Sequence, residues 1–174
     1  KTQYKIGRTL TLAANETVLY VEEWVESQTA SGRPAHWVQH VTLGPPFVAP
    51  GRNVLDMSGT QGEVRPPIEA HNSLQAGPLR WPIGTSRGGK QVSLREMQAP
   101  PNTGTYYGIL MDPSREESYF TAYNKDLRIL IGYIWKTEDF PWIADWQENQ
   151  SIDVLPWNGK VIARGIEFGT TPFA

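Results

Sequence analysis

Histidine and carboxylate side chains are the groups in this chain whose chemistry could build a site. The 174 residues include 3 His and 18 Asp and Glu but no Cys, which excludes thiol nucleophiles and thiolate metal sites. His40 stands out because the strand-like run around it stops abruptly at Gly44-Pro45-Pro46. We therefore expect His40 near the end of a strand, where a rigid element can present a functional side chain.

His36 lies four residues before His40, a spacing that would suit a metal pair on a helix. Pro34 and the alternating pattern of His36–Thr42 predict a strand instead, with both histidines on one face. Four residues span about 13 Å along a strand, which is too far for two ligands of one metal ion. We therefore expect no metal site and keep His36 as a candidate substrate-binding residue, the alternative being a solvated strand histidine.

Glu167 is the second candidate for chemistry. If the segment around it is a strand, Ala163, Gly165 and Glu167 share one face. The small residues would leave room for a ligand beside the carboxylate, which could then act as a general base or anchor a hydroxyl group. The alternative is an ordinary strand glutamate that faces water or pairs with Arg164.

A tryptophan-rich segment suggests the kind of ligand. Trp142 and Trp146 lie close to a further carboxylate, Glu148. Aromatic faces stack on the apolar C–H face of a sugar ring, while carboxylates, amides and imidazoles bind its hydroxyl groups. We therefore expect these three residues to contribute to a carbohydrate site. The alternative is that the 7 Trp, 7 Tyr and 5 Phe are all core residues.

Short strands are the elements that must position these residues. Turn residues divide the chain into short segments with a period-two alternation of apolar and polar side chains. The clearest such segments are Thr17–Val25, His36–Thr42, Ser118–Tyr123 and Leu127–Trp135. The fold class is therefore predicted to be all-β, an antiparallel β-sandwich with few short helical turns.

Three further segments complete the predicted organisation. Asn158-Gly159 is a typical hairpin dipeptide and is expected to join strands at Ser151–Leu155 and Val161–Phe168. Gly, Pro, Ser and Asn are frequent from Gly51 to Asn102, which predicts long excursions between strands. Only Phe140–Gln147 suits a short helical turn.

Length and charge exclude several classes of partner. The usual size of domains predicts a single domain over residues 1–174. A net charge of −2 offers no basic field for nucleic acid or an anionic membrane. The longest apolar stretch, Ile129–Trp135, is too short to span a bilayer. Gly84–Lys90 lacks the spacing of a phosphate-binding loop, so we expect no cofactor. The lack of cysteine does not distinguish a cytoplasmic from a periplasmic protein.

Several of these motifs together resemble the galactose-mutarotase-like (aldose 1-epimerase-like) superfamily. The run Gln39–Phe47 is similar to that family's histidine motif, and Arg164–Thr170 is similar to its late strand that contains a glutamate. The runs that resemble its remaining strands and its tryptophan-rich segment are Glu22–Glu26, Tyr107–Pro113 and Phe140–Glu148.

The resemblance implies a fold and a reaction. The family fold is an antiparallel β-supersandwich about twice as long as this chain, so the chain would correspond to its later half and lack an N-terminal portion. That expectation agrees with a first residue, Lys1, that is not Met. In the family, a glutamate takes the proton of the anomeric hydroxyl and a histidine protonates the ring oxygen of a hexose. Carried over by motif, Glu167 would be the base and His40 the acid of a cofactor-independent isomerase.

Three functional hypotheses follow. The first is a carbohydrate-binding, mutarotase-like protein that acts as an aldose 1-epimerase on a small sugar. The second is a noncatalytic β-sandwich module that binds sugar or is completed by a second chain or an N-terminal half. The third is a glycoside-cleaving site that uses Glu167 with Glu148, whose carboxyl groups would then lie about 5–10 Å apart.

Overall fold

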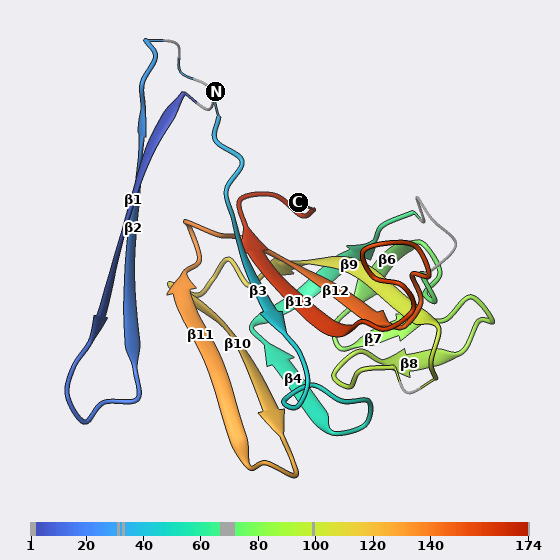
Figure 1. Ribbon diagram of the computed structural model, residues 1–174. Coiled ribbons are helices and arrows are strands. Elements are labelled where there is room, and N and C mark those ends of the chain that lie inside the picture. The colour runs from blue at the N-terminus through green and yellow to red at the C-terminus, as the bar shows by residue number, and fades with distance from the viewer. Residues whose placement is uncertain (1–2, 31, 33, 67–71, 99, 174) are drawn as a thin grey trace. The chain divides into compact units, whose positions relative to one another are not determined.

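The chain consists of two compact units, Lys1–Ala35 and His36–Ala174. The computed structural model describes residues 3–30, 32, 34–66, 72–98 and 100–173. All the regular elements in these ranges are β-strands, and they pair antiparallel (Figure 1). No helix in the described ranges has the length and apolar character needed to cross a membrane.

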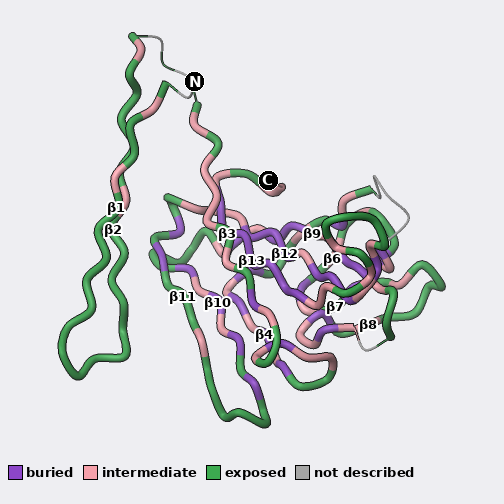
Figure 2. The backbone as a smooth tube through the Cα atoms, viewed as in Figure 1, coloured by how far each residue is buried: buried purple, intermediate pink, exposed green. Residues whose placement is uncertain are grey.

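The first unit contains a β-hairpin. Strands β1 (Tyr4–Leu12) and β2 (Leu19–Ser27) pair along their whole length. The alternation read from Thr17–Val25 is present in β2, with Leu19, Val21 and Val25 on one face. Both faces are largely exposed, as the green tube in Figure 2 shows. The alternation thus predicts the strand correctly but not its burial.

The second unit contains two sheets. The larger has eight strands in the order β3-β13-β12-β9-β5-β6-β7-β8, and the smaller has three in the order β11-β10-β4. The strands of the larger sheet, in chain order, are β3 (Val38–Leu43), β5 (Gly59–Val64), β6 (Gly77–Arg80), β7 (Ile83–Thr85), β8 (Gln91–Ser93), β9 (Thr103–Met111), β12 (Trp142–Asn149) and β13 (Ile162–Gly169). Those of the smaller sheet are β4 (Asn53–Met57), β10 (Glu117–Asn124) and β11 (Ile129–Lys136).

An aromatic core joins the two sheets into a sandwich. Phe168 on β13 stacks on Trp135 of β11, with ring centroids 4.4 Å apart, and also contacts Phe120 of β10 at 6.3 Å. Ile109 and Ile143 are fully buried in the same cluster. They lie on the same face of the larger sheet as Phe168, the face that packs in the core.

The predicted all-β sandwich is confirmed. Strands β3, β10 and β11 lie where the alternation predicts them, and β10 and β11 pair as a hairpin. The described part of the segment from Gly51 to Asn102 holds five short strands as well as loops, so the prediction of long excursions is only partly right.

Two local predictions are wrong. Phe140–Gln147 does not form a helical turn, because Trp142–Asn149 is the central strand β12, paired on both sides. Six of its eight residues are buried, including the polar residues Asp145, Gln147 and Asn149, so this central strand lacks the solvent-facing polar side that is typical of a half-buried strand. Residues 151–155 are not a strand; together with Asn158 and Gly159, both at positive φ, they belong to the long loop between β12 and β13.

Candidate functional site

His40 and Glu167 lie side by side on neighbouring strands. They are direct partners in the antiparallel pairing of β3 with β13, so both side chains point to the same face of the larger sheet. The His40 Nε2 atom is 3.1 Å from Glu167 Oε1. The sheet thus converts two distant sequence positions into an acid–base pair.

Thr42 fixes the orientation of the imidazole. Its hydroxyl oxygen lies 3.0 Å from His40 Nδ1, and residues 40 and 42 share a face because they are two apart on a strand. A carboxylate can only accept a hydrogen bond, so Nε2 donates to Glu167. In the neutral ring, Nδ1 then accepts the Thr42 hydroxyl proton. The threonine and the glutamate together select the tautomer that carries its proton on Nε2.

Three side chains close in on a buried glycine beside the pair. A Cβ atom at Gly165 would lie 3.2 Å from His40 Cε1, 3.3 Å from Trp146 Cε3 and 3.6 Å from Glu167 Oε1. Gly165 therefore marks the point where the imidazole, the indole and the carboxylate come together. A side chain there would compete with any ligand that contacts all three groups.

The C-terminal segment covers the neighbouring part of this face. Next to Glu167, the row continues through Ala144 on β12 and Gly108 on β9. A Cβ atom at Gly108 would lie only 2.5 Å from the carbonyl oxygen of Pro172, so the chain crosses the sheet directly above this glycine. Ala144 is buried as well. On this face His40 and Thr42 of β3 are exposed, whereas Gly165 and Glu167 of β13 are buried.

Trp142 and Trp146 lie on the same face but have different neighbours. Trp146 is the register partner of Gly165, beside His40 and Glu167. Trp142 instead lines a hollow of about 220 Å³ with Leu110, Pro172 and the β5 residues Gln61, Gly62 and Glu63. The tryptophan that accompanies the acid–base pair is thus Trp146.

Burial and charge act in opposite directions on Glu167. Its side chain is 6% exposed, whereas that of His40 is 48% exposed. Burial raises the pKa of Glu167 above its ordinary value, the charge of His40 lowers it, and the charge of Asp145 raises it. The net shift is upward, which makes Glu167 a better proton acceptor than an exposed glutamate.

A buried ion pair supports these strands from the opposite face. Arg164 Nη2 donates to Asp145 Oδ2 at 2.7 Å, and the Tyr107 hydroxyl donates to the same oxygen at 2.9 Å. Arg164 Nη2 also donates to the Leu94 carbonyl oxygen at 2.6 Å. Burial, followed by the charge of Asp145, raises the pKa of Tyr107 well above its ordinary value, so its hydroxyl stays protonated and can donate. The cluster ties β9, β12 and β13 to one another beneath the pair.

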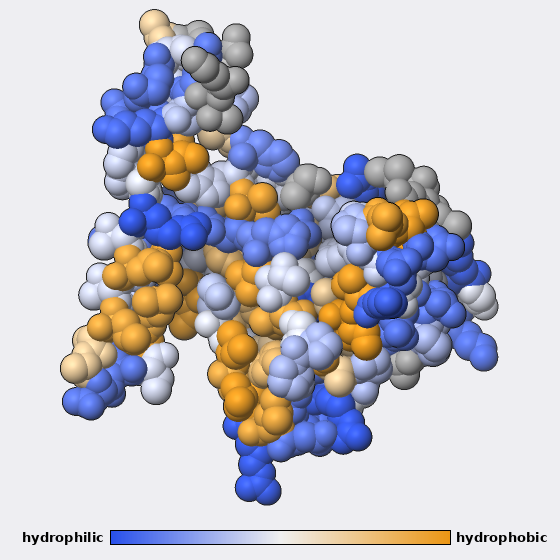
Figure 3. Space-filling view, in the orientation of Figure 1, coloured by the Kyte–Doolittle hydropathy of each residue, from blue (hydrophilic) through white to orange (hydrophobic). Residues whose placement is uncertain are grey.

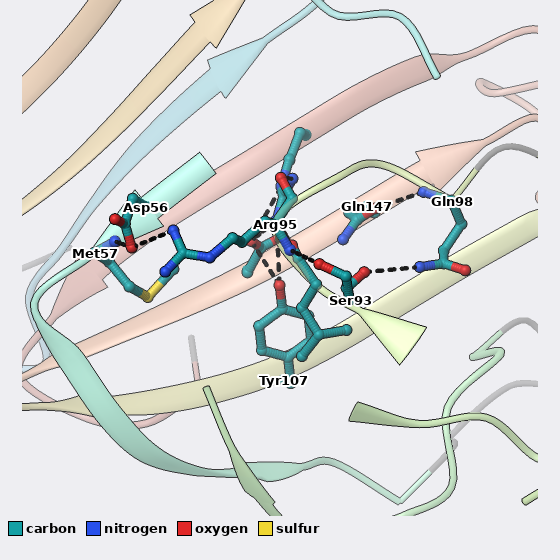
Figure 4. A network of polar contacts seen from close by, with 10 residues as sticks. Asp56, Met57, Ser93, Arg95, Gln98, Tyr107 and Gln147 are labelled. Carbon is teal, nitrogen blue, oxygen red and sulfur yellow. Dashed lines mark hydrogen bonds and ion pairs between the residues drawn. The ribbon is translucent and has the colours of Figure 1, made fainter. Parts of the chain in front are cut away.

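The loop after β8 extends this network (Figure 4). Arg95 forms an ion pair with Asp56 of β4 at 2.7 Å, and the Gln98 backbone N–H donates to Gln147 Oε1 of β12 at 3.3 Å. The Gln98 side chain donates to the carbonyl oxygen of Ser93 at 3.5 Å. This loop thus links a strand of the smaller sheet to the central strand of the larger one.

His36 and Glu148 lie away from the pair. His36 precedes β3, which begins at Val38, so the two histidines do not share a strand. Its ring nitrogen Nε2 contacts the Thr171 hydroxyl. Glu148 is buried, and its carboxylate accepts hydrogen bonds from the Ser151 hydroxyl at 2.6 Å and from the Ile152 N–H at 3.0 Å. Glu148 therefore holds the loop that follows β12.

The register also separates Glu148 from Glu167. Glu148 pairs with Ala163, four residues along β13 from Glu167, which corresponds to about 13 Å along the strand. That spacing exceeds the about 5–10 Å needed by two carboxyl groups that cleave a glycosidic bond. The glycoside-cleaving hypothesis therefore has no support in the arrangement of these strands.

No metal centre is found in the described ranges. Nowhere in them do three or more His, Asp or Glu side chains come together as metal ligands would. The chemistry available at the described face is proton transfer and hydrogen bonding by His40, Glu167 and Thr42.

Two features of the site have weak or no sequence signals. The spacing of two places Thr42 on the His40 face, but it does not reveal that the hydroxyl holds the imidazole. The crossing of Pro172 over Gly108 has no local signal, since it depends on how the segment after β13 folds back.

Comparison with known proteins gives no family for the chain: no family model matches it, and neither a curated protein nor a solved structure does.

Proposed function

We propose that this protein binds a small sugar over β3 and β13 and interconverts its anomers as an aldose 1-epimerase does. The single observation that carries the proposal is the contact between His40 and Glu167 at 3.1 Å, beside the indole of Trp146 at Gly165. His40 would be the general acid and Glu167 the general base. No cofactor is required for such a reaction.

The closeness of the two groups suits the chemistry of a cyclic sugar. The ring oxygen and the anomeric hydroxyl are bonded to the same carbon, so an acid and a base that serve them must lie side by side. Glu167 takes the hydroxyl proton while the imidazolium form of His40 gives its Nε2 proton to the ring oxygen and becomes neutral, and the bond between that oxygen and the anomeric carbon breaks. The open-chain aldehyde then recloses on its other face, and both protons return. The raised pKa of Glu167 favours the first step.

Trp146 supports a sugar as the ligand. Its indole packs at Gly165 next to His40 and Glu167, where it can stack on the C–H face of a ring whose oxygens reach these two residues. Trp142 and its hollow next to Pro172 would contact a second ring or a substituent. Under this proposal His36 and Glu148 make no contact with the sugar.

Calorimetric titration with a panel of hexoses, followed by polarimetry of freshly dissolved α-glucose and α-galactose, tests the proposal. We expect binding by at least one hexose and faster anomerisation than in buffer. His40→Ala or Glu167→Gln should each slow the reaction by about 10²–10⁴-fold, the usual contribution of one proton-transfer group.

Two variants separate the site from general damage. His36→Ala removes an exposed histidine outside the pair and should leave binding unchanged. Gly165→Val places a side chain between the imidazole, the indole and the carboxylate and should abolish binding. The proposal fails if no hexose binds and the anomerisation rate equals that in buffer.

A noncatalytic sugar-binding module is the second candidate. It is favoured by the direct hydrogen bond within the pair, because a donor and an acceptor held together can bind two hydroxyl groups without transferring a proton. This function predicts hexose binding that is lost in Glu167→Gln, with anomerisation at the rate of buffer.

A further inference from the structure

One face of the β1–β2 hairpin is apolar and exposed. Three cross-strand pairs, Ile6 with Val25, Leu10 with Val21 and Leu12 with Leu19, point to this face. Their six side chains belong to residues that are 39% to 64% exposed. Figure 3 shows apolar side chains gathered along the hairpin.

An ion pair interrupts the apolar rows. Arg8 and Glu23 are direct partners in the register, between the Ile6–Val25 row and the Leu10–Val21 row. Arg8 Nη2 and Glu23 Oε1 form an ion pair. The face therefore carries one cation on β1 and one anion on β2, side by side at the same level along the strands.

The opposite face has a different character. Lys5, Thr9, Glu22 and Glu26 point to it together with Trp24 and Tyr20, so it mixes polar and aromatic side chains. An isolated two-stranded hairpin is only marginally stable in water, and exposed aliphatic side chains gathered on one face are typical of an interaction surface. The apolar face is thus the one expected to bind a partner.

We propose that this face packs against the same face of a second copy of the chain. A twofold axis that runs parallel to the strands, between the two hairpins, places β1 of one copy over β2 of the other. Each apolar row then meets an apolar row of the same height. Arg8 of one copy lies over Glu23 of the second copy, and Glu23 lies over Arg8 of the second copy.

Charge complementarity selects a second copy as the partner. The twofold axis exchanges the positions of β1 and β2 but keeps each cross-strand pair at the same level along the strands. It therefore brings Arg8 of each copy opposite Glu23 of the other. Four charges of alternating sign then form a closed ring with apolar pairs on both sides. A twofold axis perpendicular to the strands, at the level of this pair, would instead place Arg8 over Arg8 and Glu23 over Glu23, so the arrangement also specifies the symmetry.

Light scattering over a range of protein concentrations tests the proposal. We expect a reversible monomer–dimer equilibrium, with the dimer favoured at high concentration. Glu23→Arg gives four cations at the centre of the interface, and Arg8→Glu gives four anions. Each of these variants should remain monomeric by itself. A 1:1 mixture of the two should form a heterodimer, because the cationic face of one then opposes the anionic face of the other.

The mixture distinguishes an interface from a damaged hairpin. A substitution that only unfolded the hairpin would not be rescued by mixing two damaged chains. Thr9→Lys, on the opposite face, is the matched control and should leave the equilibrium unchanged, whereas Leu10→Lys should abolish the dimer. The proposal is overturned if the native chain is monomeric at every concentration, if its dimer survives Glu23→Arg, or if the mixture stays monomeric.

Discussion

At the scale of single residues, the position of Glu167 is defined by what surrounds its carboxylate. His40 supplies a donor at 3.1 Å, Gly165 lets the imidazole, the indole and the carboxylate approach one another, and the surrounding protein removes most of the water. Burial outweighs the charge of His40, so the pKa of Glu167 is raised above the ordinary value of 4.5. A glutamate with this setting can accept a proton near neutral pH more readily than an exposed one.

The raised pKa predicts a specific pH dependence of stability. Between 4.5 and the raised pKa of the folded protein, the folded state binds more protons at Glu167 than the unfolded state does. The contribution of Glu167 to the free energy of unfolding is therefore greatest below pH 4.5 and falls as the pH rises through the folded pKa. Urea unfolding of the native chain and of Glu167→Gln at several pH values should show the native chain losing stability relative to the variant over this window.

The His40→Ala variant provides the control for this prediction. It removes the one named contribution that lowers the Glu167 pKa, so the window should extend to higher pH. A native chain that gains stability relative to Glu167→Gln as the pH rises would contradict the upward shift.

At the scale of elements, the two faces of β13 present their side chains to different surroundings. Gly165 and Glu167 point to the accessible face, while Arg164 and Phe168 point into the core between the sheets. This separation follows from the period of two along a strand. The buried Arg164 holds the strand in place, and the adjacent residues are free to form a site.

Arg164→Met should strongly destabilise the fold. The substitution leaves the Asp145 carboxylate, which is fully buried, without its cation. Loss of one partner of a buried ion pair costs about 3–5 kcal/mol, measurable as a lower free energy of unfolding in urea. Arg52→Met is the matched control, since the Arg52–Asp126 pair is more than half exposed and should contribute about 0–1 kcal/mol. Equal losses for the two variants would contradict a structural role specific to Arg164.

At the scale of the whole molecule, the two units differ in how their backbone is protected. The hairpin of the first unit consists of two strands with mostly exposed side chains. The central strands β12 and β9 of the second unit are each paired on both sides and are largely buried. Local unfolding should therefore cost far less free energy in the hairpin than in the second unit.

Hydrogen exchange measured at a concentration where the chain is monomeric should show this difference. Amides of β1 and β2 are expected to exchange with little protection, while those of β12 should exchange only through global unfolding. The proposed dimer adds a second expectation, namely that protection of β1 and β2 rises with protein concentration while that of β12 does not. Equal protection of both units in the monomer would contradict the division.

The sequence by itself predicts the all-β class and several strands, because alternation and turn residues are local signals. β2, β3, β10 and β11 could be recognised since each has a chemically distinct pair of faces. β12 could not, because its polar residues Asp145, Gln147 and Asn149 share the face that is buried in the core, so the alternation does not separate a core side from a solvent side. Local patterns therefore identify edge and half-exposed strands better than central ones.

The candidate site, too, could be predicted from the sequence only in part. Residue chemistry and the family resemblance singled out His40 and Glu167, and spacing alone placed small residues beside the glutamate. Only the pairing of β3 with β13 brings these two residues to 3.1 Å, separates Glu148 from them and leaves Trp146 rather than Trp142 at their side. Such contacts depend on strand order and register, which are set by the packing of the whole sheet and not by any short segment.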